Sequence, residues 1–155
     1  MKRNTLLTTI DLGRQWQVSF DFKATNYDYN GWTNILHLTI GGNFGNLGER
    51  TPAINYHPRS DLGLQIGTAI GSDPTYPTYS MHVKPPPPAG EWTRIVISQL
   101  TTGTTTTFSH RIGEAAPVTK ENPAPQEFSS VKVYAANPWT ETQAGFIRGL
   151  NIKTQ

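Results

Sequence analysis

Hydrophobic and polar residues alternate along most of this chain. In the first clear example, Trp16, Val18, Phe20 and Phe22 occupy every second position, and polar residues stand between them. Side chains of a β-strand point alternately to the two faces of a sheet, so this pattern predicts a strand with one buried face. No segment repeats its hydrophobic residues at the helical period of about 3.6, and we therefore expect almost no helix.

Eight further segments have the same alternation, with Gly, Pro, Asn or Asp at many of their ends. They lie at 36–40, 54–56, 62–66, 78–84, 91–100, 104–112, 128–135 and 145–154. About nine short strands with turn signals between them predict an all-β domain over 1–155, an antiparallel jelly-roll sandwich of two sheets. The expected core contains Trp16, Phe20, Leu38, Leu64, Ile95, Ile97, Val133 and Leu150.

Composition and charge exclude several classes of protein. The chain has 155 residues, and its 13 Lys and Arg are scattered singly against 11 Asp and Glu. A nucleic-acid-binding surface needs clustered cations, so we expect no nucleic-acid partner. No apolar run approaches the roughly 20 residues of a membrane span. The absence of cysteine excludes disulfides and cysteine-ligated zinc.

The first sixteen residues, MKRNTLLTTIDLGRQW, begin with basic residues but continue with an apolar run that Thr and Asp interrupt. This run is too short and too polar for a secretion signal. Two interpretations remain at this point. The protein is intracellular, or the chain is an excised module or mature form of an extracellular protein.

The stretch TNYDYNGWTN at 25–34 resembles the beginning of a calcium-binding EF-hand loop, because Asn26, Asp28 and Asn30 alternate before Gly31. The twelfth position of such a loop carries a bidentate Glu, whereas this chain has His37 there. We therefore favour a turn at Asn30-Gly31, with the neighbouring aromatic residues as packing groups. A weak cation site is the alternative.

No local signature of catalysis occurs in the sequence. G-x-S-x-G, H-E-x-x-H and a glycine-rich phosphate loop are all absent. The four histidines are far apart, and each lies in or beside a predicted strand. Isolated histidines in sheets are more often partners of the backbone or of neighbouring side chains than metal ligands, so we favour that interpretation over a zinc site built across strands. The histidines are His37, His57, His82 and His110.

Several segments carry a family resemblance. GEWTRIVISQ, GFIRGLNI, NILHLTIGGN and PAINYHPRSDLGLQI together resemble laminin G modules and the concanavalin A-like lectins and glucanases. The likeness covers nearly the whole chain and implies a β-sandwich that binds glycans or proteins through its loops. GWTNILHLTIGGN and VKVYAANPW are also similar to extracellular adhesion and aggregation modules of marine invertebrates.

The chain departs from these families in two ways. Laminin G modules commonly close with a disulfide, which a chain without cysteine cannot form. The glucanases carry paired carboxylates as E-x-D-x-x-E on one strand, and this sequence contains no E-x-D. Retaining glycosidases need two carboxyl groups about 5 Å apart, so we expect no glycosidase activity and no other enzymatic activity.

If every strand crosses its sheet once, successive loops alternate between the two ends of the sandwich. Loops 41–52, 70–78, 101–103 and 136–144 would then share one rim, and loop 25–34 would lie at the other. The shared rim contains amides, carboxylates, an arginine and aromatic rings, which are the groups that bind sugars. The candidate ligand-binding residues are Asn43, Arg50, Asp73, Trp139 and Glu141. The alternative is that these residues only form solvated turns.

The sequence thus favours a non-catalytic, extracellular recognition module that binds a glycan through one rim of loops. Laminin G-like domains carry calcium at such a rim, so the resemblance makes calcium a candidate cofactor, and the sequence itself does not identify a metal. The alternative is an adhesion module that binds a protein partner or a second copy of itself. Exposed aromatic residues on a sheet face would favour this alternative.

Overall fold

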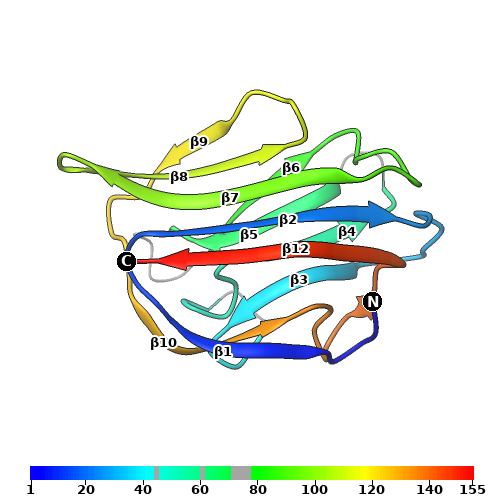
Figure 1. The fold of residues 1–155 in the computed structure, drawn as a ribbon, viewed down its shortest axis with the longest axis horizontal. Coiled ribbons are helices and arrows are strands. Elements are labelled where there is room, and N and C mark those ends of the chain that lie inside the picture. Colours follow the sequence, from blue (N-terminus) through cyan, green and yellow to red (C-terminus); the bar gives the residue numbers. More distant parts are fainter. Residues whose placement is uncertain (44–45, 60–61, 71–77) are drawn as a thin grey trace.

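The computed structural model describes residues 1–43, 46–59, 62–70 and 78–155, without the side chains of Ala69 and Thr78. These residues form two antiparallel β-sheets that pack face to face (Figure 1). The all-β jelly-roll sandwich expected from the alternating pattern is confirmed. In the described part of the chain no helix is present, and hence none that is long and apolar enough to cross a membrane.

Sheet A has seven strands among the described residues, and sheet B has five. The order in sheet A is β1-β10-β3-β4-β5-β6, with the short β11 paired in parallel with β3. Its strands are β1 (Leu6–Leu12), β3 (Thr33–Thr39), β4 (Ala53–His57), β5 (Gly63–Ala69), β6 (Thr78–Val83), β10 (Phe128–Tyr134) and β11 (Glu141–Thr142). The order in sheet B is β12-β2-β7-β8-β9. Its strands are β2 (Trp16–Ala24), β7 (Thr93–Thr102), β8 (Thr105–Ile112), β9 (Val118–Glu121) and β12 (Gly145–Thr154).

The core lies between the two sheets and is made by the inward positions of the alternating strands. Trp16 and Phe108, from β2 and β8, meet edge to face with their ring centroids 6.2 Å apart. Seven of the eight predicted core residues are buried, and Leu150 is half-buried against the core. The period-two pattern therefore identified the buried face correctly, because alternate residues of a strand face opposite sides of the sheet.

All nine predicted strands are present, and the structure adds β1, β9 and β11. The alternating pattern did not predict these three strands, for physical reasons. All four residues of β9 are exposed, and β1 is exposed over most of its length, so neither needs a clean apolar face. β11 has only two residues, which is too short for any periodicity.

The segment 25–34 bends at Asn30 and Gly31, where the sequence predicted a turn, but it is not a hairpin. β2 belongs to sheet B and β3 to sheet A, so this segment carries the chain from one sheet to the other. Its tyrosines are packing groups, as expected: Tyr27 stacks on Tyr56 at 4.4 Å and donates a hydrogen bond to the carbonyl of Pro87. The hydroxyl of Tyr29 accepts a hydrogen bond from the backbone N–H of Ala144.

Candidate functional site

The outer face of sheet A carries a row of polar side chains. Asn55 on β4 pairs in register with Gln65 on β5, and both stand between apolar residues that point into the core. A β-bulge between Asn34 and Leu36 on β3 shifts the register by one residue. As a result Asn34 and His37, three positions apart, both face outward. This polar face is the floor of the candidate site.

Loop segments cover this floor and leave a pocket of about 250 Å³. We call it the sheet-face pocket. Its lining residues are Trp32, Asn43, Arg50, Asn55, Gln65 and Thr140. They come from the segment before β3, the loop after β3, the strands β4 and β5, and the segment before β11, so the site exists only in the folded chain.

Asn43 and Arg50 hold each other in place at the wall of the pocket. Nη2 of Arg50 donates to the backbone carbonyl of Asn43 at 2.7 Å, and Nδ2 of Asn43 donates to the hydroxyl of Thr140 at 3.2 Å. Gly42 precedes Asn43, and a Cβ at this position would collide with the Glu49 carboxylate. A side chain at this position would therefore require the Glu49 carboxylate to move.

Two polar atoms of this wall are buried and have no hydrogen-bond partner among the described residues. They are Oδ1 of Asn43 and Nε of Arg50. Arg50 also forms no ion pair with any carboxylate of the described chain, and burial lowers the pKa of its guanidinium, opposed by the nearby Glu49. Buried polar atoms are normally satisfied, and an arginine stays charged in a protein. The wall thus contains one acceptor and one cationic donor whose hydrogen-bonding capacity is unused among the described residues.

Behind this wall, His37 is completely buried and neutral. Its Nε2 lies 2.6 Å from the carbonyl oxygen of Glu49, which can only accept, so Nε2 carries the proton. Nδ1 accepts from the side-chain amide of Asn137 at 2.8 Å. The pKa of His37 is lowered to about 4, chiefly by burial and also by the charge of Arg50, against the opposing effects of the Glu49 carbonyl and carboxylate. His37 is therefore a structural support of the pocket.

The five candidate residues from the sequence lie in different places. Asn43 and Arg50 line the sheet-face pocket. Trp139 lies beside it, 42% exposed, with its ring 5.7 Å from that of His37. Glu141 is exposed and forms an ion pair with Arg3 at 3.4 Å, away from the pocket lining. Asp73 falls outside the described residues.

The expected division of the loops between two rims is wrong. β10 runs antiparallel to β3, and after it the backbone N–H of Ala136 donates to the carbonyl of Ile35, so loop 136–144 starts near the beginning of β3, at the opposite end from loop 41–52. Moreover, Trp32 of the segment 25–34 lines the same pocket as Asn43. The error arose because β9, which lies between loops 101–103 and 136–144, was not counted, and because the loops fold back over the sheet face.

Sequence reasoning missed four of the pocket residues as ligand-binding candidates: Trp32, Asn55, Gln65 and Thr140. The polar positions of the alternating strands could have identified two of them, because Asn55 and Gln65 are the large amide side chains on the outward faces of β4 and β5. Trp32 is 38% exposed and rests edge-on against the ring of His57 at 4.8 Å, so it provides an apolar wall opposite the polar groups.

Within the residues that the structure describes, no three His, Asp or Glu side chains lie close enough together to hold a metal ion. His37, His57 and His82 have backbone or side-chain partners instead, as the sequence analysis favoured.

Neither a comparison with protein-family models nor one with curated protein sequences finds a match for this chain. Solved structures do match over 97–98% of its length. One is a native heptameric SAP-like pentraxin from Limulus polyphemus, with a TM-score of 0.60, 14% identity and 71% of that chain covered. A second is the CBM40 of a Ruminococcus gnavus IT-sialidase bound to α2,3-sialyllactose, with a TM-score of 0.54, 11% identity and 87% covered.

A third match is the exoplasmic/lumenal domain of VIP36 in its form bound to Ca²⁺ and Man3GlcNAc, with a TM-score of 0.50, 10% identity and 72% of that chain covered. Two of the three structures thus hold a sugar. At these levels of identity the comparison concerns the fold. The chain has a concanavalin A-like jelly-roll fold, which it shares with these three proteins.

Proposed function

We propose that this chain is a non-catalytic, extracellular recognition module that binds a glycan in the sheet-face pocket. The observation that carries the proposal is the pair of buried, unpartnered atoms on one wall, Oδ1 of Asn43 and Nε of Arg50. A sugar hydroxyl donates to the first, and an acidic group of the sugar accepts from the second. The sugars bound by CBM40 and VIP36 are consistent with this use of the fold.

The size and chemistry of the pocket limit the kinds of ligand that it can bind. Its volume of about 250 Å³ is below the range of about 300–1,000 Å³ that is typical of drug-sized ligands, so it suits one sugar residue at the end of a chain. Asn55 and Gln65 supply further amide groups on the floor, and Trp32 supplies an aromatic surface for the apolar face of a sugar ring. Because Arg50 lacks a carboxylate partner among the described residues, we propose a terminal acidic sugar.

A glycan array that pairs acidic oligosaccharides with their neutral counterparts tests this proposal. Running it once with calcium and once with EDTA decides whether a cation takes part. We expect the acidic member of a pair to bind more tightly, and Arg50→Gln to abolish this preference. Arg111→Gln is the matched control, because Arg111 is an exposed arginine on β8 in sheet B. Wild-type affinity in both Arg50→Gln and Asn43→Ala would refute the site.

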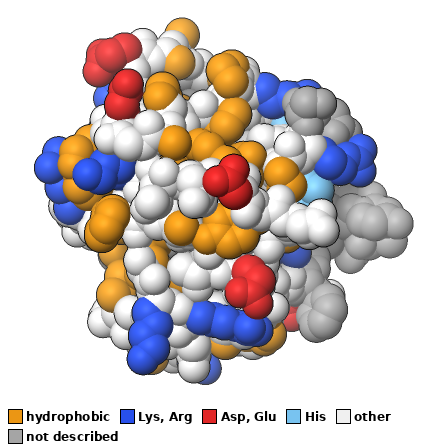
Figure 2. Space-filling model, turned by 90° about the vertical axis from the view of Figure 1, so that its right-hand side faces the viewer, with side chains coloured by type: hydrophobic (Ala, Val, Ile, Leu, Met, Phe, Trp, Pro, Cys, Tyr) orange, Lys and Arg blue, Asp and Glu red, His pale blue; other side chains and the backbone are white. Residues whose placement is uncertain are grey.

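A second candidate function rests on the outer face of sheet B. Phe146 is 56% exposed there and Trp92, next to β7, is 37% exposed. The ammonium group of Lys23 lies within 5.6 Å of both rings, and the guanidinium of Arg148 lies 4.1 Å from the Trp92 ring. Figure 2 shows basic and hydrophobic side chains side by side at its left, the side of sheet B. Exposed aromatic residues on a sheet face favour a protein partner or a second copy.

Sedimentation velocity over a wide concentration range tests the self-association form of this adhesion function. If sheet B is the contact surface, Phe146→Ser and Trp92→Ser weaken the association, whereas Arg50→Gln leaves it unchanged. A wild-type protein that stays monomeric at every concentration would exclude association through this face. Glycan binding and self-association are thus tested by separate variants.

A further inference from the structure

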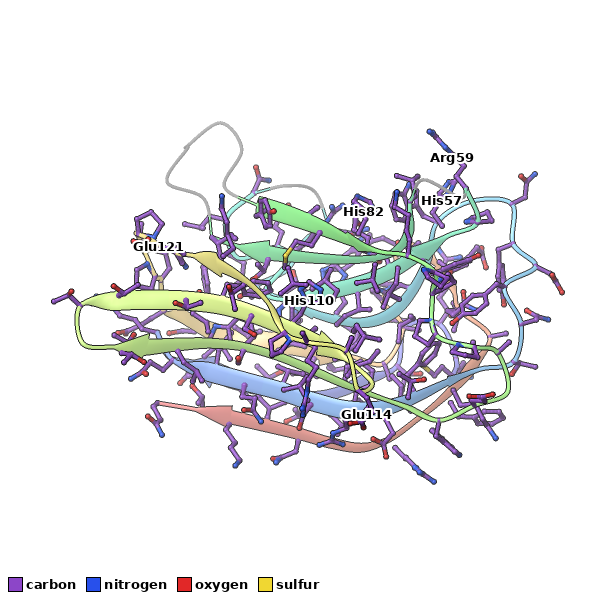
Figure 3. All side chains as sticks on the ribbon, turned by 90° about the horizontal axis from the view of Figure 1, so that it is seen from above. His57, Arg59, His82, His110, Glu114 and Glu121 are labelled. Atoms are coloured by element: carbon purple, nitrogen blue, oxygen red, sulfur yellow. The ribbon has the colours of Figure 1, made fainter. Side chains whose placement is uncertain are left out.

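His110 differs from the other three histidines, each of which has a hydrogen-bond partner. It lies on β8 between the inward-facing Phe108 and Ile112, and it is only 4% exposed. Figure 3 shows it between the two sheets, whereas His57 and His82 lie on the outer side of sheet A. Its Nδ1 is buried and has no hydrogen-bond partner among the described residues. A buried ring nitrogen of this kind is normally paired.

A cleft of about 470 Å³ opens beside this histidine. It lies between β6, the last described strand of sheet A, and β8 and β9, the last strands of sheet B. Much of its lining is apolar: Met81, Val83, Ile112, Ala115, Ala116 and Val118. Among the described residues, no strand of one sheet pairs with a strand of the other along this side.

The residues around the cleft define the chemistry of an occupant. No Asp or Glu lines it among the described residues, and burial lowers the pKa of His110, so its imidazole is neutral. Nδ1 of a neutral imidazole is either a donor or an acceptor, depending on the tautomer. A hydroxyl group can donate as well as accept, so it satisfies Nδ1 in both tautomers. The apolar part of the lining favours a hydrophobic body for the molecule, and Ser80, Lys84 and Thr119 make the rest of the lining polar.

We propose that the cleft between β6 and β8–β9 binds a small apolar alcohol or phenol whose hydroxyl pairs with Nδ1 of His110. This site is separate from the sheet-face pocket, since none of their lining residues is shared. It gives the sandwich a hydrophobic ligand site in addition to its proposed glycan site. The two sites are testable independently of each other.

The chain contains two methionines, and one of them lines the cleft. Labelling the methionine methyl groups with ¹³C therefore gives two NMR signals. Met81 reports on the cleft, whereas Met1 lines a different surface depression and serves as the internal control. The probes are 4-ethylphenol and ethylbenzene, which differ only in the hydroxyl group.

We expect 4-ethylphenol to shift the Met81 signal and to leave Met1 unchanged. One net hydrogen bond makes ethylbenzene bind about 2- to 10-fold more weakly than 4-ethylphenol. His110→Leu removes the ring nitrogens and should abolish or reverse the preference for 4-ethylphenol, because its hydroxyl would then be buried without a partner. Ala116→Trp places a large ring at an exposed position of the cleft lining and should abolish the binding of both probes.

Four results would overturn the proposal. The first is an unchanged Met81 signal with both probes, and the second is a shift of Met1 alone. The third is equal affinity of the two probes for the wild-type protein, a comparison that needs no variant and so holds even if His110→Leu does not fold. A phenol preference that persists in folded His110→Leu would likewise remove His110 from the site.

Discussion

The side-chain amide of Asn137 lies 2.8 Å from Nδ1 of His37, a residue 100 positions away, and both side chains are completely buried. Oδ1 of the same asparagine accepts from the backbone N–H groups of Trp139 and Thr140 at 3.0 and 2.8 Å. Its own backbone N–H donates to Oδ1 of Asn34 at 2.8 Å. Asn137 therefore fixes the segment that brings Thr140 to the sheet-face pocket and Trp139 beside it.

Replacing Asn137 by Ala is expected to destabilise the protein strongly. It leaves Nδ1 of His37 and two backbone N–H groups without partners. Each unsatisfied buried group costs about 1–3 kcal/mol, so we expect a loss of about 3 kcal/mol or more in the free energy of unfolding, measured in urea. Asn151 is exposed, so Asn151→Ala is the control and should change the free energy of unfolding by no more than about 0.5 kcal/mol. A loss below about 1 kcal/mol in Asn137→Ala would contradict the network.

Trp139→Ala should cost less stability than the loss of a core tryptophan. Trp139 is partly exposed and touches the rings of His37 and Tyr134 from outside, whereas Trp16 is buried in the core. We expect about 1–2 kcal/mol for Trp139→Ala and about 3–5 kcal/mol for Trp16→Ala in the same urea measurement. Equal losses would mean that Trp139 acts as a lid over a buried site.

The stability of the protein should fall as the pH drops from about 6.5 to about 4. Burial lowers the pKa of His37 to about 4, from 6.5 for an unperturbed histidine. Within this window the unfolded chain binds a proton that the folded chain does not, so acid favours unfolding. The stabilisation is fully present above pH 6.5. Below this pH the free energy of unfolding falls by up to about 1.4 kcal/mol per pH unit.

Urea unfolding at several pH values between 7.5 and 4.5 measures this slope. His110 adds to it in the same direction, because burial lowers the pKa of His110 as well. His37→Gln and His110→Leu should therefore each flatten the curve, and the double variant should flatten it further. A wild-type stability that is constant from pH 7 to pH 5 would show that His37 has the same pKa in the folded and the unfolded chain.

The protein is expected to leave glycosidic bonds intact. The described lining of the sheet-face pocket contains no carboxylate, and the sequence lacks the paired carboxylates of the glucanases. Release of reducing ends from β-glucans, galactans and sulfated glycans should stay at the level of a blank. Turnover that disappears when one Asp or Glu is replaced would establish a catalytic site elsewhere in the chain.

The sequence by itself determined the fold class and most of the core. The alternation of Trp16, Phe20, Leu38 and Ile97 with polar residues specifies which face of each strand is buried, because the backbone sends successive side chains to opposite faces. The sequence also identified Asn43 and Arg50 as candidate binding residues, from their place in a loop rich in polar residues. These properties are local, because each can be read from the sequence of one strand or one loop.

Only the tertiary structure decided which loops meet. Asn43, Trp32 and Thr140 converge on one pocket because β3 lies between β10 and β4 and because β11 returns in parallel to its beginning. The buried state of His110, which lacks a partner in the described chain, also depends on how the edges of the two sheets face each other. Such contacts join residues far apart in the chain, and the period of a strand carries no information about its neighbours in the sheet.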